Sequence, residues 1–161
     1  NNTNNSVGGA GGAGTLTSGL LFGGETPGTP GATITEEYDG TNWTSGGTLT
    51  TGRRALGGCG LSQTAGLGFG GASSTNAVQT ATEEYDGSSW TTVPGTLNSG
   101  RYIMGSCGTQ TAGLCCGGYD GSNKNESEEY NGTTWSEGNN INTIRRTLTT
   151  FGIQTAAIAT G

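Results

Sequence analysis

The sequence predicts an all-β fold built from repeated four-stranded antiparallel sheets. Three observations predict it. Gly accounts for 34 of the 161 residues while strong helix formers are few, a composition typical of short strands joined by tight turns. One ten-residue pattern occurs three times at nearly constant spacing. Each copy of the pattern contains an Asp-Gly or Asn-Gly pair, which favours a hairpin turn.

The repeated pattern runs Thr or Ser, Glu, Glu, Tyr, Asp or Asn, Gly, two further residues, Trp, and then Thr or Ser. Its copies span residues 35–44, 82–91 and 127–136. The flanking segments repeat as well, because residues 48–53 match 96–101 and, more loosely, 140–145. Residues 63–71 match 110–118, and residues 154–161 and 17–24 align with the same piece. The repeat, about 46 residues long, therefore covers nearly the whole chain.

Each repeat contains four expected strands, a to d, which are clearest in the second copy. Strand a follows the Arg and spans 53–59, strand b spans 64–69 and ends at a Gly-Gly pair, strand c spans 80–85, and strand d is centred on Trp90. Asp86-Gly87 forms the turn between c and d. Gly within strands a and b indicates a close approach of another backbone, as expected where inner strands converge on a central axis.

At these positions the chain resembles the kelch repeat. That family has a Gly-Gly pair closing the second strand, then a Tyr, a Trp, and an Arg leading into the next unit. The matching positions are Gly23-Gly24, Tyr38, Trp43 and Arg53; Gly70-Gly71, Tyr85, Trp90 and Arg101; and Gly117-Gly118, Tyr130, Trp135 and Arg145. The resemblance implies the blades of a β-propeller. The acidic pair before the Tyr departs from the family pattern. The form Thr-Glu-Glu-Tyr-Asp-Gly resembles kelch-like repeats of predicted phage virion and appendage proteins.

The blade count predicts a kelch-like β-propeller arc of about three and a half blades. Residues 1–6 are interpreted as a polar linker or frayed end, followed by blades at 7–52, 53–100 and 101–144 and half of a further blade at 145–161. Propellers need roughly 4–8 blades to close. We therefore expect a segment of a longer chain, with other blades of that chain or further copies as partners.

Composition excludes several functions. The chain contains no His, so Ser-His-Asp and Cys-His catalysis and His-ligated zinc sites are excluded within it. A net charge of −6 argues against nucleic acid as a partner, and the absence of a long apolar run argues against membrane insertion. We expect no cofactor and no metal site. The four cysteines, which match no zinc spacing, are expected to be small buried residues, with a disulfide as the alternative: Cys59, Cys107, Cys115 and Cys116.

Most chemically distinctive residues recur in every repeat, which favours structural roles. In each Glu-Glu pair, one carboxylate is expected to meet an Arg and the other to face solvent. The three Arg are expected to donate charge-assisted hydrogen bonds to carboxylates or carbonyls between blades. The Trp rings are expected to pack against the neighbouring blade, with stacking on a sugar as the alternative. No catalytic residue is predicted.

The loops between strands b and c differ among the repeats, whereas the strands do not. Tyr119 has no counterpart in the other copies and begins one of these loops. Loops on a rigid scaffold commonly bind ligands. The predicted ligand-binding residues are Tyr119, Asp120, Asn123 and Lys124 in one loop, and Ser74 and Asn76 in another.

These observations predict a non-enzymatic structural or recognition module of an extracellular or virion protein, such as a phage fibre or decoration element. A glycan-binding lectin propeller is the alternative, with a cell-surface glycan rather than a protein as the partner. A carbohydrate-active enzyme is a third hypothesis. It would need a single carboxylate constellation outside these 161 residues.

Overall fold

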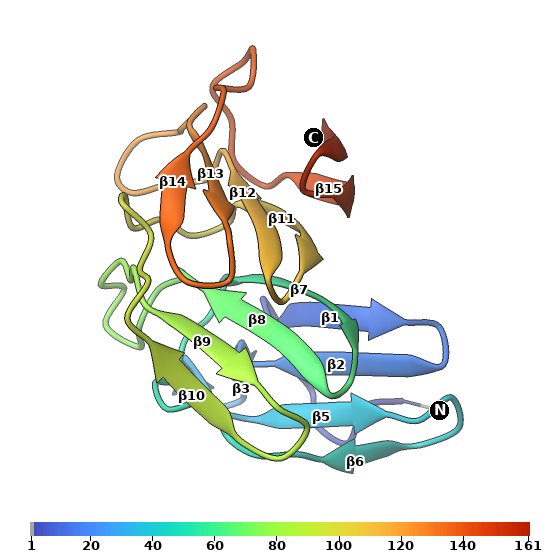
Figure 1. Ribbon diagram of the computed structural model, residues 1–161. Helices are drawn as coiled ribbons and strands as arrows, with labels where there is room; N and C mark the ends of the chain where they lie inside the picture. Colours follow the sequence, from blue (N-terminus) through green and yellow to red (C-terminus); the bar gives the residue numbers. More distant parts are fainter. Residues whose placement is uncertain (1) are drawn as a thin grey trace.

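The predicted all-β architecture is confirmed. The computed structural model describes residues 2–161, which contain strands and loops but no helix. Three four-stranded antiparallel sheets follow one another along the chain, and a two-stranded hairpin comes last (Figure 1). Each sheet is one blade, whose strands a to d pair in that order. The chain ends lie at the two ends of this row of sheets (Figure 1).

Each blade contains four strands in the order expected from the repeat, and strand a lies later along the chain than predicted. Blade 1 consists of β1 (Gly11–Thr15), β2 (Ser18–Phe22), β5 (Thr35–Tyr38) and β6 (Trp43–Ser45). Blade 2 consists of β7 (Gly57–Ser62), β8 (Ala65–Phe69), β9 (Thr82–Tyr85) and β10 (Trp90–Val93). Blade 3 consists of β11 (Gly105–Thr109), β12 (Ala112–Cys116), β13 (Ser127–Tyr130) and β14 (Trp135–Glu137). The half-blade consists of β15 (Thr149–Ile153) and β16 (Ala156–Thr160).

The innermost strands of successive blades lie side by side. β1 contacts β7, β7 contacts β11, and β11 contacts β15. Within residues 2–161, β15 contacts β11 and β12 but makes no extensive contact with β1, so the sheets form an open propeller-like arc and not a closed ring. The inner strands border a hollow of about 420 Å³ on the axis of the arc.

Strand a begins four residues later than predicted, because the backbone turns sharply before it. The second residue after each repeat Arg has a positive φ, with values of 50° at Ala55, 56° at Ile103 and 59° at Thr147. These residues form a line of backbone hydrogen bonds across the blades. Ala55 N–H donates to Gly9 O at 2.6 Å, Ile103 N–H to Ala55 O at 2.9 Å, and Thr147 N–H to Ile103 O at 3.0 Å. The left-handed residues thus join adjacent blades before the inner strands begin.

Close backbone approach at the hub accounts for glycine in strand a. A Cβ on Gly58 would lie 2.8 Å from the backbone nitrogen of Gly12 in the preceding blade. Blade 3 has Ser106 in this position, and its hydroxyl both accepts from Gly58 N–H and donates to Gly58 O at 3.0 Å. The inner strands are therefore joined through polar contacts at the hub.

The hydrophobic core lies between blades. One cluster joins blade 1 to blade 2, and a second joins blade 2 to blade 3. Burial of this apolar area is the main favourable term holding the sheets side by side. The first cluster contains Leu20, Phe22, Leu49, Leu56, Tyr85 and Trp90, and the second contains Cys59, Leu67, Phe69, Leu97, Met104, Cys115, Tyr130 and Trp135.

Two further features complete the described chain. The b–c loop of blade 1 contains a short hairpin, β3 (Glu25–Thr26) with β4 (Thr29–Pro30), which the sequence analysis treated as a loop. No helix in residues 2–161 is long and apolar enough to cross a membrane.

Candidate functional site

The repeat Arg of blade 2 makes a fully buried ion pair. An Arg53 guanidinium nitrogen lies 2.8 Å from Glu83 Oε1, and both side chains have no exposed surface. The other terminal nitrogen donates to Gly70 O and Ala81 O at 3.0 and 2.7 Å. Burial lowers the pKa of Arg53, and the charge of Glu83 opposes that shift. The second oxygen of Glu83 accepts the backbone N–H of Thr50 at 2.7 Å.

Blade 3 repeats this arrangement with Arg101 and Glu128. Their side chains form an ion pair and are each 1% exposed. Glu128 also accepts the backbone N–H groups of Asn98 and Ser99 at 2.6 and 3.2 Å. Arg101 donates to the carbonyl of Glu126 at 3.2 Å. In both blades the Arg side chain holds strand c of its own blade, so the prediction that it bonds between blades is wrong for the side chain. Its backbone carbonyl does join blades, because it accepts from the Gly-Gly pair of the preceding blade.

Blade 1 fills the same carboxylate position without an Arg. Glu36 is buried and accepts the backbone N–H groups of Asn4 and Asn5 at 2.7 and 2.9 Å, and the Asn5 side-chain amide at 2.7 Å. Val7 stands where Arg53 stands in blade 2. The stretch 1–6 was interpreted as a linker or frayed end. Asn1 lies outside the described residues, and the structure has Asn4 and Asn5 bound to strand c of blade 1.

The second Glu of the pair bridges blades in blades 1 and 2, so the prediction that it faces solvent is wrong for Glu37 and Glu84, whereas Glu129 in blade 3 is exposed as predicted. The Tyr85 hydroxyl donates to Glu37, and the Tyr130 hydroxyl donates to Glu84 at 2.9 Å. Burial, followed by the bond to Glu37, raises the pKa of Tyr85 to about 12. Strand alternation separates the two carboxylates of a pair onto opposite faces. Sequence could not show that the second face meets a Tyr of the next blade.

The repeat Trp rings lie against the preceding blade. Trp90 packs on Phe22 and Trp135 on Phe69, each with ring centroids 4.6 Å apart. Their indole N–H groups donate to Thr35 and Thr82 at 2.9 Å. Trp43 has no preceding blade within the described chain and packs on Tyr38 of its own blade. Neither Trp90 nor Trp135 has an open face for stacking on a sugar, since each is only 5–6% exposed.

The b–c loop of blade 3 holds four predicted ligand-binding residues together. Tyr119 bridges to Asn123 in the backbone, and Lys124 forms a 2.8 Å ion pair with Asp120. The hydrogen bond from Lys124 lowers the pKa of Asp120. The Tyr119 ring contacts the Tyr102 ring edge-on at 5.5 Å, and the Arg146 guanidinium lies over it at 4.7 Å. This half-buried Tyr is therefore part of a row of three side chains.

The b–c loop of blade 2 holds the other two predicted residues. The Asn76 side-chain oxygen accepts from Arg54, and Asn76 itself has a φ of 64°. Arg54 also lies 3.5 Å from Glu25 in blade 1, so it links two neighbouring loops. Ser74 is exposed, and its backbone approaches Gly31. The two predicted groups occupy equivalent loops of adjacent blades, but they do not form one contact cluster.

Four residues beside these loops were not predicted from the sequence: Glu25, Arg54, Tyr102 and Arg146. Three of them share one position, directly after the repeat Arg or its equivalent in each blade. The residue type at that position differs among these repeats, whereas the preceding residue is Arg in all three. The b–c loops vary among the repeats in the same way. Variation at a fixed repeat position could therefore have added Arg54, Tyr102 and Arg146 to the prediction. The b–c loops of blades 1 to 3 with these residues are called the loop surface below.

The cysteines are buried free thiols. Burial raises the pKa of Cys59 to about 12 and that of Cys116 to about 11, and it raises those of Cys107 and Cys115 as well. Thiolate is the reactive and metal-binding form, so these thiols are poorly suited to either role. Across residues 2–161, no group of Cys, Asp and Glu is arranged to hold a metal ion.

No family model matches the chain, and no curated protein is significantly similar to it. The arrangement of the site therefore has to be interpreted from its own residues.

Proposed function

We propose that the chain is a non-enzymatic structural or recognition module of an extracellular or virion protein, with kelch-like blades. One observation supports this best. The buried carboxylates Glu36, Glu83 and Glu128 are all engaged by Arg or backbone donors in equivalent ways. A general acid or base must be free to exchange a proton with a substrate. The repeated polar groups instead fix strands and blades, while variable side chains collect on the loop surface.

The proposal is tested by locating the protein. An antibody against the purified chain is applied to particles, culture fluid and lysed cells of the source, each separated on a density gradient. We expect the protein in the particle or extracellular fraction. Recovery from the cell interior alone would contradict the proposal.

A glycan-binding lectin is the second candidate function, and the row of Tyr102, Tyr119 and Arg146 favours it. An aromatic ring beside exposed polar side chains suits a sugar, which offers an apolar face and hydroxyl groups. The test is an array of oligosaccharides probed with the labelled chain. Glycan binding that is lost in Tyr119→Ala supports the lectin. The control is Leu16→Ala, since Leu16 is 89% exposed in the β1–β2 turn, at the opposite end of β2 from the b–c loop. If neither the unsubstituted chain nor the Leu16→Ala variant binds any glycan, the lectin hypothesis is contradicted.

A further inference from the structure

The outer edge of β16 is open. In blades 1, 2 and 3, strand b pairs with strand c on this edge, as β2 with β5, β8 with β9 and β12 with β13. Within residues 2–161, β16 pairs only with β15. Ile158 is 59% exposed, whereas the matching Leu20 and Leu67 are 2% and 0% exposed. Leu20 and Leu67 pack against the following blade, so within residues 2–161 the half-blade lacks both a strand c on β16 and a following blade that would cover Ile158.

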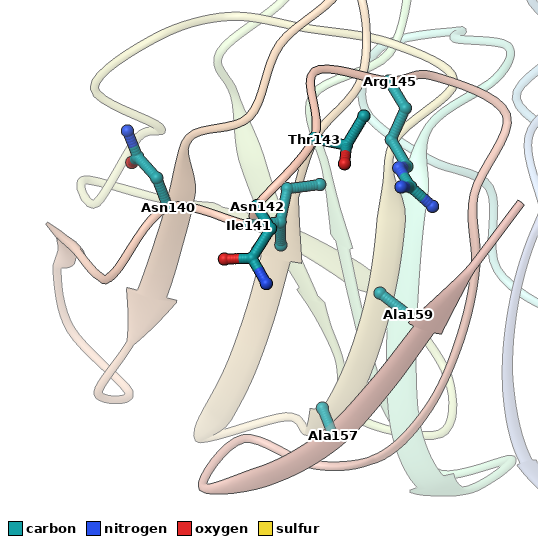
Figure 2. A pocket seen from close by; sticks show the side chains of 7 residues that line it. All are labelled: Asn140, Ile141, Asn142, Thr143, Arg145, Ala157 and Ala159. Carbon is teal, nitrogen blue, oxygen red and sulfur yellow. The ribbon is translucent and has the colours of Figure 1, made fainter.

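A pocket of about 360 Å³ lies beside this open edge. Figure 2 shows Ala157 and Ala159 on β16 at one side of it, and Asn142 and Arg145 on the preceding loop at the other. Asn142 corresponds to Thr50 and Asn98, whose backbone N–H groups bind Glu83 and Glu128. The pocket thus occupies the position in which the first Glu of strand c lies in blades 2 and 3.

Arg145 makes two of the bonds that Arg53 makes outside the ion pair. Its backbone carbonyl accepts from Gly118 at 3.0 Å, as Arg101 O accepts from Gly71. Its guanidinium donates to Gly161 O at 2.9 Å, as Arg53 donates to Gly70 O at 3.0 Å. Among the described residues Arg145 has no Asp or Glu partner. The cation is in position for a carboxylate on a strand paired with β16.

Blade 3 presents the two remaining contacts for such a strand. Glu129 is exposed, whereas its counterparts Glu37 and Glu84 accept a Tyr hydroxyl from the next blade. Ser127 matches Thr35 and Thr82, which accept an indole N–H from the next blade. The half-blade itself is docked as in a complete blade. Gln154 donates to carbonyls of Gly113 and Tyr130, as Gln110 does one blade earlier.

We propose that the edge of β16 and the Arg145 pocket bind an extended antiparallel strand of the pattern Ser/Thr-Glu-Glu-Tyr, followed by Trp five residues after the Tyr. By the register of the complete blades, its first Glu lies opposite Ala159 and meets Arg145, and its Tyr lies opposite Ala157 and reaches Glu129. Backbone hydrogen bonds to the sheet edge supply affinity and the side-chain pockets supply specificity.

The occupant is a segment that belongs to no other sheet. A second folded copy cannot supply it, because β5, β9 and β13 each have a neighbour on both sides. The acidic pair also fits the charge of the pocket, whose one charged residue is Arg145. This inference depends on the blade repeat and is independent of the proposed function.

The test uses a capped peptide with the sequence of residues 82–91 and the full chain. Binding is followed by heteronuclear NMR and by polarisation of a labelled peptide. We expect saturable binding, with shifts at Arg145, Ala157 and Ile158. Replacing the first Glu of the peptide by Gln, or Arg145→Gln in the chain, weakens binding by about tenfold or more, because each removes a charged hydrogen bond. Combining the two changes adds little further loss. Arg146→Gln is the matched control and leaves affinity within about twofold.

A second experiment attaches the strand covalently, so that its binding does not depend on the affinity of a free peptide. The sequence of residues 118–136 is attached after Gly161, so that the added strand reaches β16 from the same position as in blade 3. We expect the midpoint temperature of thermal unfolding to rise by about 3 °C or more relative to the unextended chain. Arg145→Gln is expected to remove most of that rise. The proposal is overturned if neither arm shows an effect. It is also overturned if the Glu and Arg145 substitutions leave binding unchanged, or if the peptide shifts the edges of β6, β10 or β14 instead.

Discussion

Blades 1 and 2 bury the same carboxylate with different donors. Glu83 is bound by the guanidinium of Arg53 and one backbone N–H. Glu36 is bound by two backbone N–H groups and one side-chain amide, and Val7 stands where the Arg would be. Both carboxylates are 0% exposed. Their positions on strand c and their pairing with strand b are the same in both blades.

The shared element is the backbone of the loop that precedes strand a. Asn4 and Thr50 occupy equivalent positions, and each donates its N–H to the carboxylate at 2.7 Å. The comparison teaches that strand c needs two or three donors at this point and that the cation is one of several ways to supply them. A buried cation also makes the blade sensitive to loss of the carboxylate, because the guanidinium would then be buried without a counter-charge.

The largest expected effect separates the two blades directly. Glu83→Gln leaves the Arg53 guanidinium buried without its counter-charge, and we expect it to lower the free energy of unfolding by about 3–5 kcal/mol. Glu36→Gln leaves no buried cation, and we expect a loss of about 1–2 kcal/mol from weakened hydrogen bonds. Urea unfolding of both variants beside the unsubstituted chain measures the difference. Equal losses would show that the Arg is not the source of the asymmetry.

The next effect concerns the Tyr that joins the two blades. Tyr85→Phe removes the bonds to Glu37 and to Gly47 N–H, and we expect a loss of about 1.5–3 kcal/mol at neutral pH. Folding raises the pKa of Tyr85 from 10.0 to about 12, so the protonated phenol is favoured in the fold. Its contribution is complete below pH 10 and is lost as the pH rises toward 12.

The measurement is the difference in unfolding free energy between Tyr85→Phe and the unsubstituted chain from pH 8 to pH 11. We expect that difference to shrink with rising pH. Titration of the buried thiols also destabilises the fold in this range, but it is common to both proteins. Tyr38→Phe is the control, since Tyr38 contacts no preceding blade within residues 2–161. A constant difference across the pH range contradicts the prediction.

Sequence predicted the strands and their repeat because local chemistry specifies both. Asp86-Gly87 demands a turn, and the Gly-Gly pairs adopt positive φ values in all three blades. Contacts across blades were not predictable in the same way. Alternation along strand c separates Glu36 from Glu37, yet it does not say that Tyr85, 48 residues away, faces Glu37.

The loop surface was predicted in part for a related reason. Loop variability predicted Tyr119 and Asn76 as ligand-binding residues. Their partners lie outside those loops, because Arg146 belongs to the half-blade and Arg54 lies 22 residues before Asn76. The left-handed backbone at Ala55, Ile103 and Thr147 has no sequence signature, because none of these residue types favours positive φ. It is imposed by the hydrogen bonds between blades.

Introducing the missing Arg into blade 1 sharpens the comparison. In Val7→Arg the guanidinium is expected to reach Glu36 and the carbonyls that match Gly70 and Ala81, which raises the free energy of unfolding by about 1 kcal/mol. Glu36→Gln becomes more costly in that background, with a coupling of about 0.5–3 kcal/mol in a double-mutant cycle. A coupling of zero would mean that Asn4 and Asn5 leave no room for the cation at Glu36.

The smallest effect tests the backbone that both blades share. The left-handed position is Gly9 in blade 1, with a φ of 59°, and Ala55 in blade 2, with a φ of 50°. Left-handed φ costs a non-glycine residue about 1–2 kcal/mol, and a glycine costs about 0.5–1 kcal/mol in lost entropy. These terms nearly cancel, so we expect Ala55→Gly to stabilise the chain by about 0.5 kcal/mol. The reverse change, Gly9→Ala, is expected to be destabilising, since its Cβ would also lie 3.4 Å from Ala55 N. Chemical denaturation of the pair resolves the two signs. A clear loss in Ala55→Gly would mean that the Ala55 methyl group contributes more through packing than its backbone costs in strain.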